Sequence, residues 1–279
     1  MESVRRKEFE MDFESSQEVV SNLGDKALAK SKLPFFRLSI LGIMAGCFIA
    51  LGYLAFIRIS GTVPKSWGGF STFLGGCLFP IGLVALTFIG GELATGNMMV
   101  MTLGLLQRKI SGKSLLYNWL IVLVTNCIGG MLVAYFFGHI VGLTEGAFLE
   151  KTLSVAQAKM ADPPFVAFIS GIGCNIFVCL AVYLGAMGKT YLGKMFGLWF
   201  PVMVFVVCGF QHVVANAFII PAAIFSTVSG IQWSDYLSNT LFVFLGNAVG
   251  GSLFLAVPLM FVTTEKKEVH ETEGVYEKY

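Results

Sequence analysis

The sequence contains little charge for its length. Asp, Glu, Lys and Arg make up only 13% of the 279 residues, about half of the ~25% usual in soluble proteins. The mean hydropathy is +0.76, and several apolar segments approach or exceed the ~20 residues that a membrane-spanning helix needs. The shortage of charge excludes a soluble domain and predicts an all-α polytopic membrane protein.

Cysteine pairs and metal-ligand clusters are also missing. The six cysteines all lie within apolar segments, and none belongs to a CxxC pair, so we interpret them as small buried hydrophobes and expect no disulfide and no metal site. The sequence shows no nucleophile–base pair and no phosphate-binding loop. We therefore expect no cofactor and no enzymatic activity. The first 16 residues have no apolar core, so we expect no cleavable signal peptide.

The apolar segments predict six transmembrane spans, so both termini should lie on the same side of the membrane. The spans are flanked by an N-terminal arm (1–35) and a C-terminal tail (264–279), and together they form a channel domain (36–263). Of the 19 Lys and Arg residues, only Arg58, Lys65, Lys151 and Lys159 fall on the opposite side. Because positive charge concentrates on the cytoplasmic side, we expect both termini in the cytoplasm of a cell-membrane protein. The predicted spans are 36–57, 70–106, 115–141, 164–187, 196–230 and 237–263.

Two of the segments are too long for one straight helix. Residues 70–106 and 196–230 each cover about 35 positions, whereas one crossing needs ~20. Each has glycine and polar residues near its middle, "GGELATGN" at 90–97 and "GFQHVVANAF" at 209–218. Paired interruptions of this kind are typical of broken helices that face a path at the membrane midplane. The sequence therefore predicts two broken helices.

The chain also matches itself at an offset of 121 residues. The third span, "NWLIVLVTNCIGGML", and the sixth, "NTLFVFLGNAVGGSL", share Asn, Leu, Val, Asn, Gly, Gly and Leu at the same spacing. The first and fourth spans share a Gly-Cys pair at 46–47 and 173–174, an offset of 127. Because three is an odd number of spans, the two halves must have opposite orientations. This pattern predicts an inverted 3+3 repeat, as in channels and transporters.

These motifs resemble the formate/nitrite transporter family, which includes formate, nitrite and hydrosulfide channels. The resemblance covers residues 15–263 and depends on "GGELATGN", "GCNIFVCLAVYLG" (173–185), "GFQHVVANAFIIP" (209–221) and "GNAVGG" (246–251). It implies an aquaporin-like inverted repeat with six spans, a homopentamer in the bilayer and one path for a small anion through each protomer. The hydrosulfide ion is an alternative substrate within the same family.

The resemblance also implies a set of path residues. His212 matches the central histidine, and Thr95 matches the threonine of the loop that breaks the second span. Two lysines match residues near the mouths of the path, Lys159 on the outer side and Lys26 on the inner side, although Lys159 could instead be a solvated partner of Asp162 or Glu150. Apolar residues that narrow the path are Phe79, Leu83, Leu93 and Phe205, and the family asparagines are Asn175, Asn216 and Asn247.

One path residue departs from the family pattern. Ala94 stands where many members have phenylalanine, so the loop reads "ELAT"; a smaller side chain would widen the constriction or free the loop, which leaves the choice of anion open. Glu92 is the only acid within a span, and we interpret it as an acceptor for backbone N–H groups freed by the break. Gln211 and the asparagines are expected to bond loop backbone or neighbouring spans, with direct contact to substrate as the alternative.

The chemistry suggests how an anion could cross. Desolvation of an anion in an apolar constriction is costly, and the positive ends of broken helices or a transferred proton would lower that cost. We expect Lys159 to gather anions, and His212 with Thr95 to stabilise the anion and share a proton, since free histidine titrates near pH 6.5. Transport should then rise with external acidity. A pore for neutral solutes is the rival from another class, although paired Asn-Pro-Ala boxes are absent.

Overall fold

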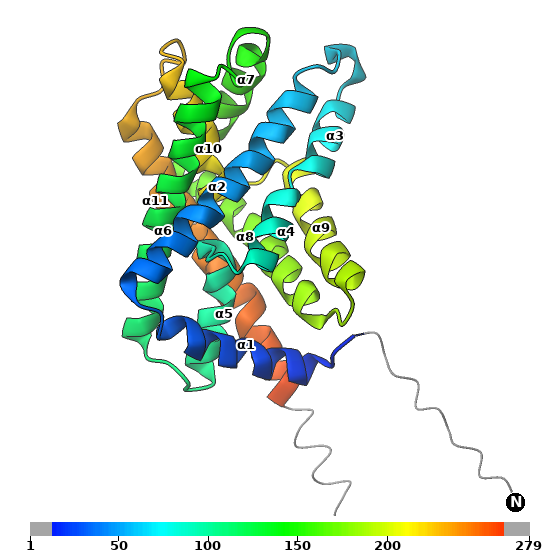
Figure 1. Ribbon diagram of the computed structural model, residues 1–279, viewed down its shortest axis with the longest axis vertical. Coiled ribbons are helices and arrows are strands. Elements are labelled where there is room, and N and C mark those ends of the chain that lie inside the picture. Colours follow the sequence, from blue (N-terminus) through cyan, green and yellow to red (C-terminus); the bar gives the residue numbers. More distant parts are fainter. Residues whose placement is uncertain (1–12, 265–279) are drawn as a thin grey trace, which may run out of the picture.

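The computed structural model is helical throughout and describes residues 13–264 (Figure 1). Residues 1–12 and 265–279 lie outside the described residues, and with them the start of the predicted N-terminal arm and most of the predicted C-terminal tail. Helices α1 and α7 lie at opposite ends of the molecule (Figure 1). These two ends are named the α1 side and the α7 side below.

The described chain consists of two successive sets of helices. Short 3-10 turns, η1 (Lys65–Trp67) and η3 (Gly146–Phe148), precede α3 and α7. The first set is α1 (Ser16–Ser31), α2 (Phe35–Ser60), α3 (Phe70–Leu78), α4 (Ile81–Ile89), α5 (Ala94–Leu106) and α6 (Gly112–Val133), which is extended by the π-helical η2 (Ala134–Ile140). The second set is α7 (Leu149–Met160), α8 (Pro164–Met187), α9 (Tyr191–Val207), α10 (Val213–Phe225) and α11 (Trp233–Gly251), which is extended by the π-helical η4 (Ser252–Ala256).

Five helices of the described chain are long and apolar enough to cross a membrane, which agrees with five of the predicted spans. The remaining predicted span, 196–230, is divided between the shorter helices α9 and α10. The prediction of an all-α membrane protein with broken helices is therefore confirmed. The five long helices are Phe35–Ser60, Phe70–Ile89, Gly112–Ile140, Pro164–Met187 and Trp233–Thr264.

Both long segments are interrupted near the middle. The interruption between α4 and α5 begins at Gly90, and the one between α9 and α10 contains Gly209; their φ angles are 87° and 74°. Glycine adopts this left-handed conformation without a steric penalty, which explains why these residues can turn the chain at the helix ends. Pro80 adds a further break, between α3 and α4, because proline has no N–H for the helix ladder.

Helix α1, the described part of the N-terminal arm, packs on the protein. Its apolar face (Val19, Val20, Leu23 and Ala27) is buried in one cluster with residues of α5. The side chain of Gln107, at the end of α5, donates a hydrogen bond to the carbonyl of Val20 at 2.8 Å. The described part of the N-terminal arm is therefore a helix whose apolar face contacts α5.

Matching hydrogen bonds show that residues of the two halves correspond at different offsets in different helices. Asn126 donates to the carbonyl of Gly42 at 2.7 Å, and Asn247, 121 residues further on, donates to the carbonyl of Gly171 at 2.8 Å. Because 42 plus 129 is 171, the first and fourth spans correspond at an offset of 129. The Gly-Cys pairing predicted at 127 is therefore wrong, because it matched residue types whose contacts in the structure do not correspond. The same offset of 129 makes α1 the counterpart of α7.

Glycines allow the paired spans to touch backbone to backbone. A Cβ placed on Gly250 of α11 would lie 2.4 Å from the carbonyl oxygen of Ile172 in α8, and one on Gly246 would lie 2.0 Å from that of Phe168. Both distances are far below any normal contact. Small residues are therefore required where α8 crosses α11, as is common between membrane helices.

Gly246→Ala should destabilise the protein by about 1–3 kcal/mol, the usual cost of overpacking. The added methyl group meets the backbone of Phe168, which cannot rotate away. Thermal unfolding in detergent measures the effect. Gly112→Ala is the matched control, because a Cβ at Gly112 meets no atom within 4 Å. Equal melting temperatures for the two variants would contradict the close α8–α11 crossing.

Candidate functional site

Thr95 and His212 meet where the two broken spans approach each other. Thr95 is the second residue of α5, and His212 directly precedes α10. The Oγ1 atom of Thr95 lies 3.0 Å from Nε2 of His212, and the two residues are 0% and 2% exposed. Residues from opposite halves of the chain thus form one buried polar pair.

The position of the hydrogen on the His212 ring follows from its other contact. The backbone N–H of Ala215 donates to Nδ1 of His212 at 3.0 Å, so His212 caps the N-terminus of α10. In a neutral imidazole only one ring nitrogen carries hydrogen, and a nitrogen that accepts a hydrogen bond is not that one. The hydrogen is therefore on Nε2, directed at Thr95.

A cavity of about 240 Å³ lies on the α7 side of this pair. The ring of Phe205 stacks on the ring of His212, with centroids 5.5 Å apart, and the rings of Phe79 and Phe205 form a T-shaped pair with centroids 5.7 Å apart. These three rings and Lys159 line the cavity. The two predicted aromatic residues therefore lie in the wall of the same cavity as His212.

A second cavity, of about 420 Å³, lies on the α1 side. Leu83 and Leu93 line it, together with Lys26, Lys30 and Glu92. The two cavities have no lining residue in common. Phe79, Phe205 and His212 thus line one cavity and Leu83 and Leu93 the other, and Thr95 lines neither.

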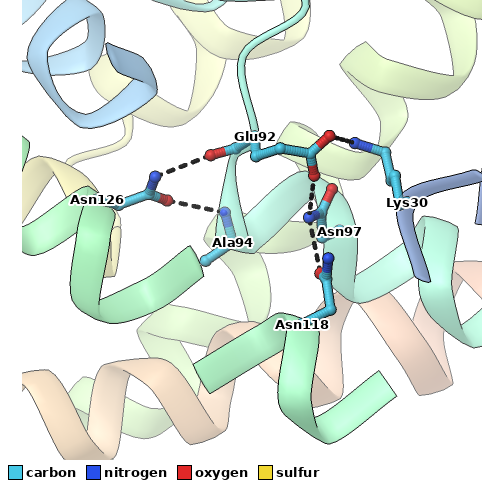
Figure 2. A network of polar contacts seen from close by, with 6 residues as sticks. All are labelled: Lys30, Glu92, Ala94, Asn97, Asn118 and Asn126. Atoms are coloured by element: carbon cyan, nitrogen blue, oxygen red, sulfur yellow. Dashed lines mark hydrogen bonds and ion pairs between the residues drawn. The ribbon is translucent and has the colours of Figure 1, made fainter. Parts of the chain in front are cut away.

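Asn126 holds the first interrupted loop in place. Its Nδ2 donates to the carbonyl of Glu92 at 2.8 Å, and its Oδ1 accepts from the N–H of Ala94 at 2.9 Å (Figure 2). Backbone groups that the helix ladder leaves open are thereby satisfied, as they must be at membrane depth. The side chain of Ala94 is fully buried and lines neither of the two cavities just described.

Asn247 does the same for the second loop. Its Nδ2 donates to the carbonyl of Gln211 at 3.1 Å, and its Oδ1 accepts from the N–H of Val213 at 3.0 Å. Asn175 donates to the carbonyls of Asn247 at 2.7 Å and Thr95 at 3.2 Å. Neither Asn175 nor Asn247 lines the two cavities, whereas Asn216 lines the cavity on the α7 side.

Glu92 makes a different contact from the expected one. Its carboxylate accepts from side chains, Nζ of Lys30 and Nδ2 of Asn97 at 2.7 Å, and Asn97 donates in turn to Asn118 at 2.8 Å (Figure 2). The interpretation of Glu92 as an acceptor for backbone N–H groups is therefore wrong. Lys30 was missed by the sequence analysis. The sequence carries no signal for it, because the offset of 129 that aligns Lys30 with Lys159 follows from contacts in the structure.

The two predicted vestibule lysines both line cavities. Nζ of Lys159 donates to the carbonyls of Gly209 and Phe210, each at 2.7 Å. Burial lowers the pKa of Lys159 to about 8, and the nearby Cys174 and Asp162 oppose this shift. Burial also lowers the pKa of Lys26, as do the neighbouring positive charges of Lys30 and Lys194.

The broken helices and the buried pair with cavities on both sides of it define a multi-pass membrane protein of the channel and transporter class. The chain belongs to the formate/nitrite transporter family, which it matches over residues 17–261. This membership confirms the family resemblance and the expectation that the protein is not an enzyme. Among residues 13–264 no group of three His, Cys, Asp or Glu side chains could hold a metal ion.

Relatives of the chain include transporters and channels. The "Uncharacterized transporter YrhG" of Bacillus subtilis (strain 168) is 47% identical over 92% of this chain and 96% of that protein. The "Formate channel BtFdhC" of Bacillus thuringiensis is 41% identical over 88% of this chain and 94% of that protein. A solved "Pentameric formate channel with formate bound" is 26% identical, with a TM-score of 0.71 over 82% of this chain and 97% of that one.

Competitive labelling with a small amine reagent should show Lys159 reacting with a midpoint near pH 8, well below the ~10.4 of a free lysine side chain. The lowered pKa arises because burial disfavours the ammonium form. Mass spectrometry of the labelled protein against an N-acetyl-lysine amide standard measures the midpoint. A midpoint equal to that of the standard would show that Lys159 is fully solvated.

Proposed function

We propose that the protein is a transmembrane channel for small monovalent anions of weak acids, with formate as the first candidate. The observation that carries this proposal is the buried Thr95–His212 pair, which has one cavity on its α7 side and another on its α1 side. The names of the relatives, a formate channel and a solved channel with formate bound, support the choice of substrate.

The constriction would select for a dehydrated or protonated species. Leu83 and Leu93 on one side and Phe79 and Phe205 on the other offer no polar group to a hydrated ion. Between them the Nε2–H of His212 and the hydroxyl of Thr95 can each donate a hydrogen bond to one small anion. Charge-assisted bonds of this kind are about twice as strong as neutral ones.

Two helix N-termini would add to this stabilisation. α5 begins at Ala94 and α10 at Val213, next to the polar pair on either side. The N-terminal end of a helix carries a partial positive charge, equivalent to about half an elementary charge. Broken helices in transporters direct such ends at anionic substrates, and the two loops here suit that role.

We further propose that a proton crosses with the anion. A weak acid that is protonated at the constriction loses the cost of desolvating its charge, so transport should accelerate as the pH falls on the side from which the anion comes. Lys159 and Lys26, which line the two cavities, would concentrate anions there. His212 is the central group in this scheme.

The arrangement in the membrane is also part of the proposal. The excess of Lys and Arg on the side of the termini favours a cytoplasmic α1 side. The pentameric state of the solved formate channel supports a homopentamer with one path in each protomer.

Reconstitution into liposomes tests the function. The purified protein should carry formate, and competition among formate, nitrite and hydrosulfide would rank the anions. An osmotic swelling arm with glycerol tests the neutral-solute alternative. Swelling with glycerol together with absence of anion flux would overturn the proposal.

His212→Asn should lower formate flux about 10- to 100-fold and abolish its rise between about pH 8 and pH 5, because the strong donor at Nε2 is lost. Asparagine is a preferred N-cap residue, so α10 keeps a cap. Stopped-flow or isotope flux across the pH series measures the change.

His139→Asn is the matched control, since His139 lines neither cavity and contacts Glu145. This control should keep both the flux and its pH response. If His212→Asn moves formate with the rate and pH profile of the unmodified protein, the role given to His212 is wrong.

A further inference from the structure

Lys30 and Lys159, the lysines next to the two interrupted loops, occupy equivalent positions in the repeat. Adding 129 to 30 gives 159, the offset that relates Gly42 to Gly171. The loops correspond at an offset of 119, because Gly90 and Gly209 both turn in the left-handed conformation. At that offset the residue that corresponds to Glu92 is Gln211.

On the α1 side the lysine next to the loop is neutralised. Lys30 forms an ion pair with Glu92, whose side chain is only 5% exposed (Figure 2). The other carboxylate oxygen accepts from Asn97 at 2.7 Å. Positive charge on this side comes instead from Lys26 and Lys194, which also line the cavity.

On the α7 side the position equivalent to Glu92 holds the amide of Gln211, which bonds to acceptors through its nitrogen and to a donor through its oxygen. The Nε2 atom of Gln211 donates to the carbonyl of Lys159 at 2.9 Å and to Oδ2 of Asp162 at 2.8 Å. Its Oε1 accepts from Asn216 at 2.7 Å, as Glu92 accepts from Asn97. Two acceptors on one end and a donor on the other match an amide, whereas an ionised carboxylate would meet the charge of Asp162.

Lys159 consequently has no ion-pair partner among the described residues. Its Nζ is bonded to two carbonyl oxygens, and among residues 13–264 no carboxylate lies within ion-pair distance of it. Asp162, the nearby acid, lines a separate cavity of about 390 Å³ with Asp235. Gln211 lies between the two and bonds to both residues.

We propose that Gln211 determines the affinity for anions on the α7 side: by holding an amide where the other half of the repeat holds a carboxylate, it leaves Lys159 free to attract the substrate. The two mouths then obtain positive charge in different ways. On the α1 side Lys26 and Lys194 supply the positive charge, because Lys30 is paired with Glu92. On the α7 side Lys159 supplies it, because no carboxylate in the described part of the chain is paired with that lysine. This inference rests on the proposed function, since it concerns the anion that the path carries.

A charge swap tests the proposal with little change in shape. In the double variant Gln211→Glu with Asp162→Asn, net charge and side-chain size are kept, but the carboxylate moves next to Lys159. The half-saturating formate concentration for flux from the α7 side should rise about tenfold, the effect of a nearby opposite charge at a partly screened site. An epitope tag at one terminus reports the orientation of the protein in the liposomes.

Two further variants serve as references. Gln157→Glu makes the same change at an exposed position of α7 and should stay within about twofold of the unmodified protein, because exposed charges interact weakly. Asp162→Asn alone keeps the amide at 211 and should not raise the half-saturating concentration. A charge-swapped protein with unmodified half-saturation would overturn the proposal.

A readout without transport separates this inference from the proposed function. In the charge-swapped variant the labelling midpoint of Lys159 should rise relative to the unmodified protein, because the new carboxylate stabilises the ammonium form. If the unmodified protein carries no formate, the proposed function fails, yet the labelling still measures the effect of residue 211 on Lys159. An unchanged midpoint would show that residue 211 does not control the charge of Lys159.

Discussion

The structure depends on hydrogen bonds that satisfy the broken backbone at membrane depth. A peptide group without a partner costs several kcal/mol in hydrocarbon, so irregular backbone survives there only when protein groups bond it. Asn126 and Asn247 supply these bonds from the third and sixth spans, each linking an interrupted loop to the span that begins its own half. Without them the second and fifth spans could not be interrupted, and no polar pair could exist at the centre.

The same constraint gives His212 two roles. Its Nδ1 satisfies the N–H of Ala215 at the start of α10, and this fixes both the orientation of the ring and the nitrogen that carries the hydrogen. Nε2–H is therefore directed at Thr95 in the resting structure. The capping bond that helix termini require thus prepares the donor that the proposed transport uses.

Much of the fold could be predicted from the sequence, because span length, interruptions and charge bias are local properties of the chain. The site was only partly predictable. Asn175 and Asn247 are expected from the sequence either to bond backbone or to contact substrate. Only the tertiary structure shows the amide of Asn247 bonded to loop backbone and that of Asn175 bonded to the backbone of helices α11 and α5. The Lys30–Glu92 ion pair depends on the packing of α1 against α5, a contact that no local pattern encodes. The mispaired Gly-Cys motif shows that an offset must be inferred from contacts.

The repeat duplicates the scaffold but not the chemistry. Asn126 and Asn247 make matching bonds, yet at the loop offset of 119 His212 corresponds to Leu93 and Thr95 corresponds to Val214. If both halves carried the histidine, two rings would compete for one buried space, and each would need a hydrogen-bond partner. Because each half contributes a different polar residue beside an apolar counterpart, a single donor–acceptor pair is enclosed by hydrophobic side chains. The loop backbone is held in the same way in both halves, but the residues at positions 93 and 212 and at 95 and 214 differ. These differences make one polar constriction from two equivalent helix breaks.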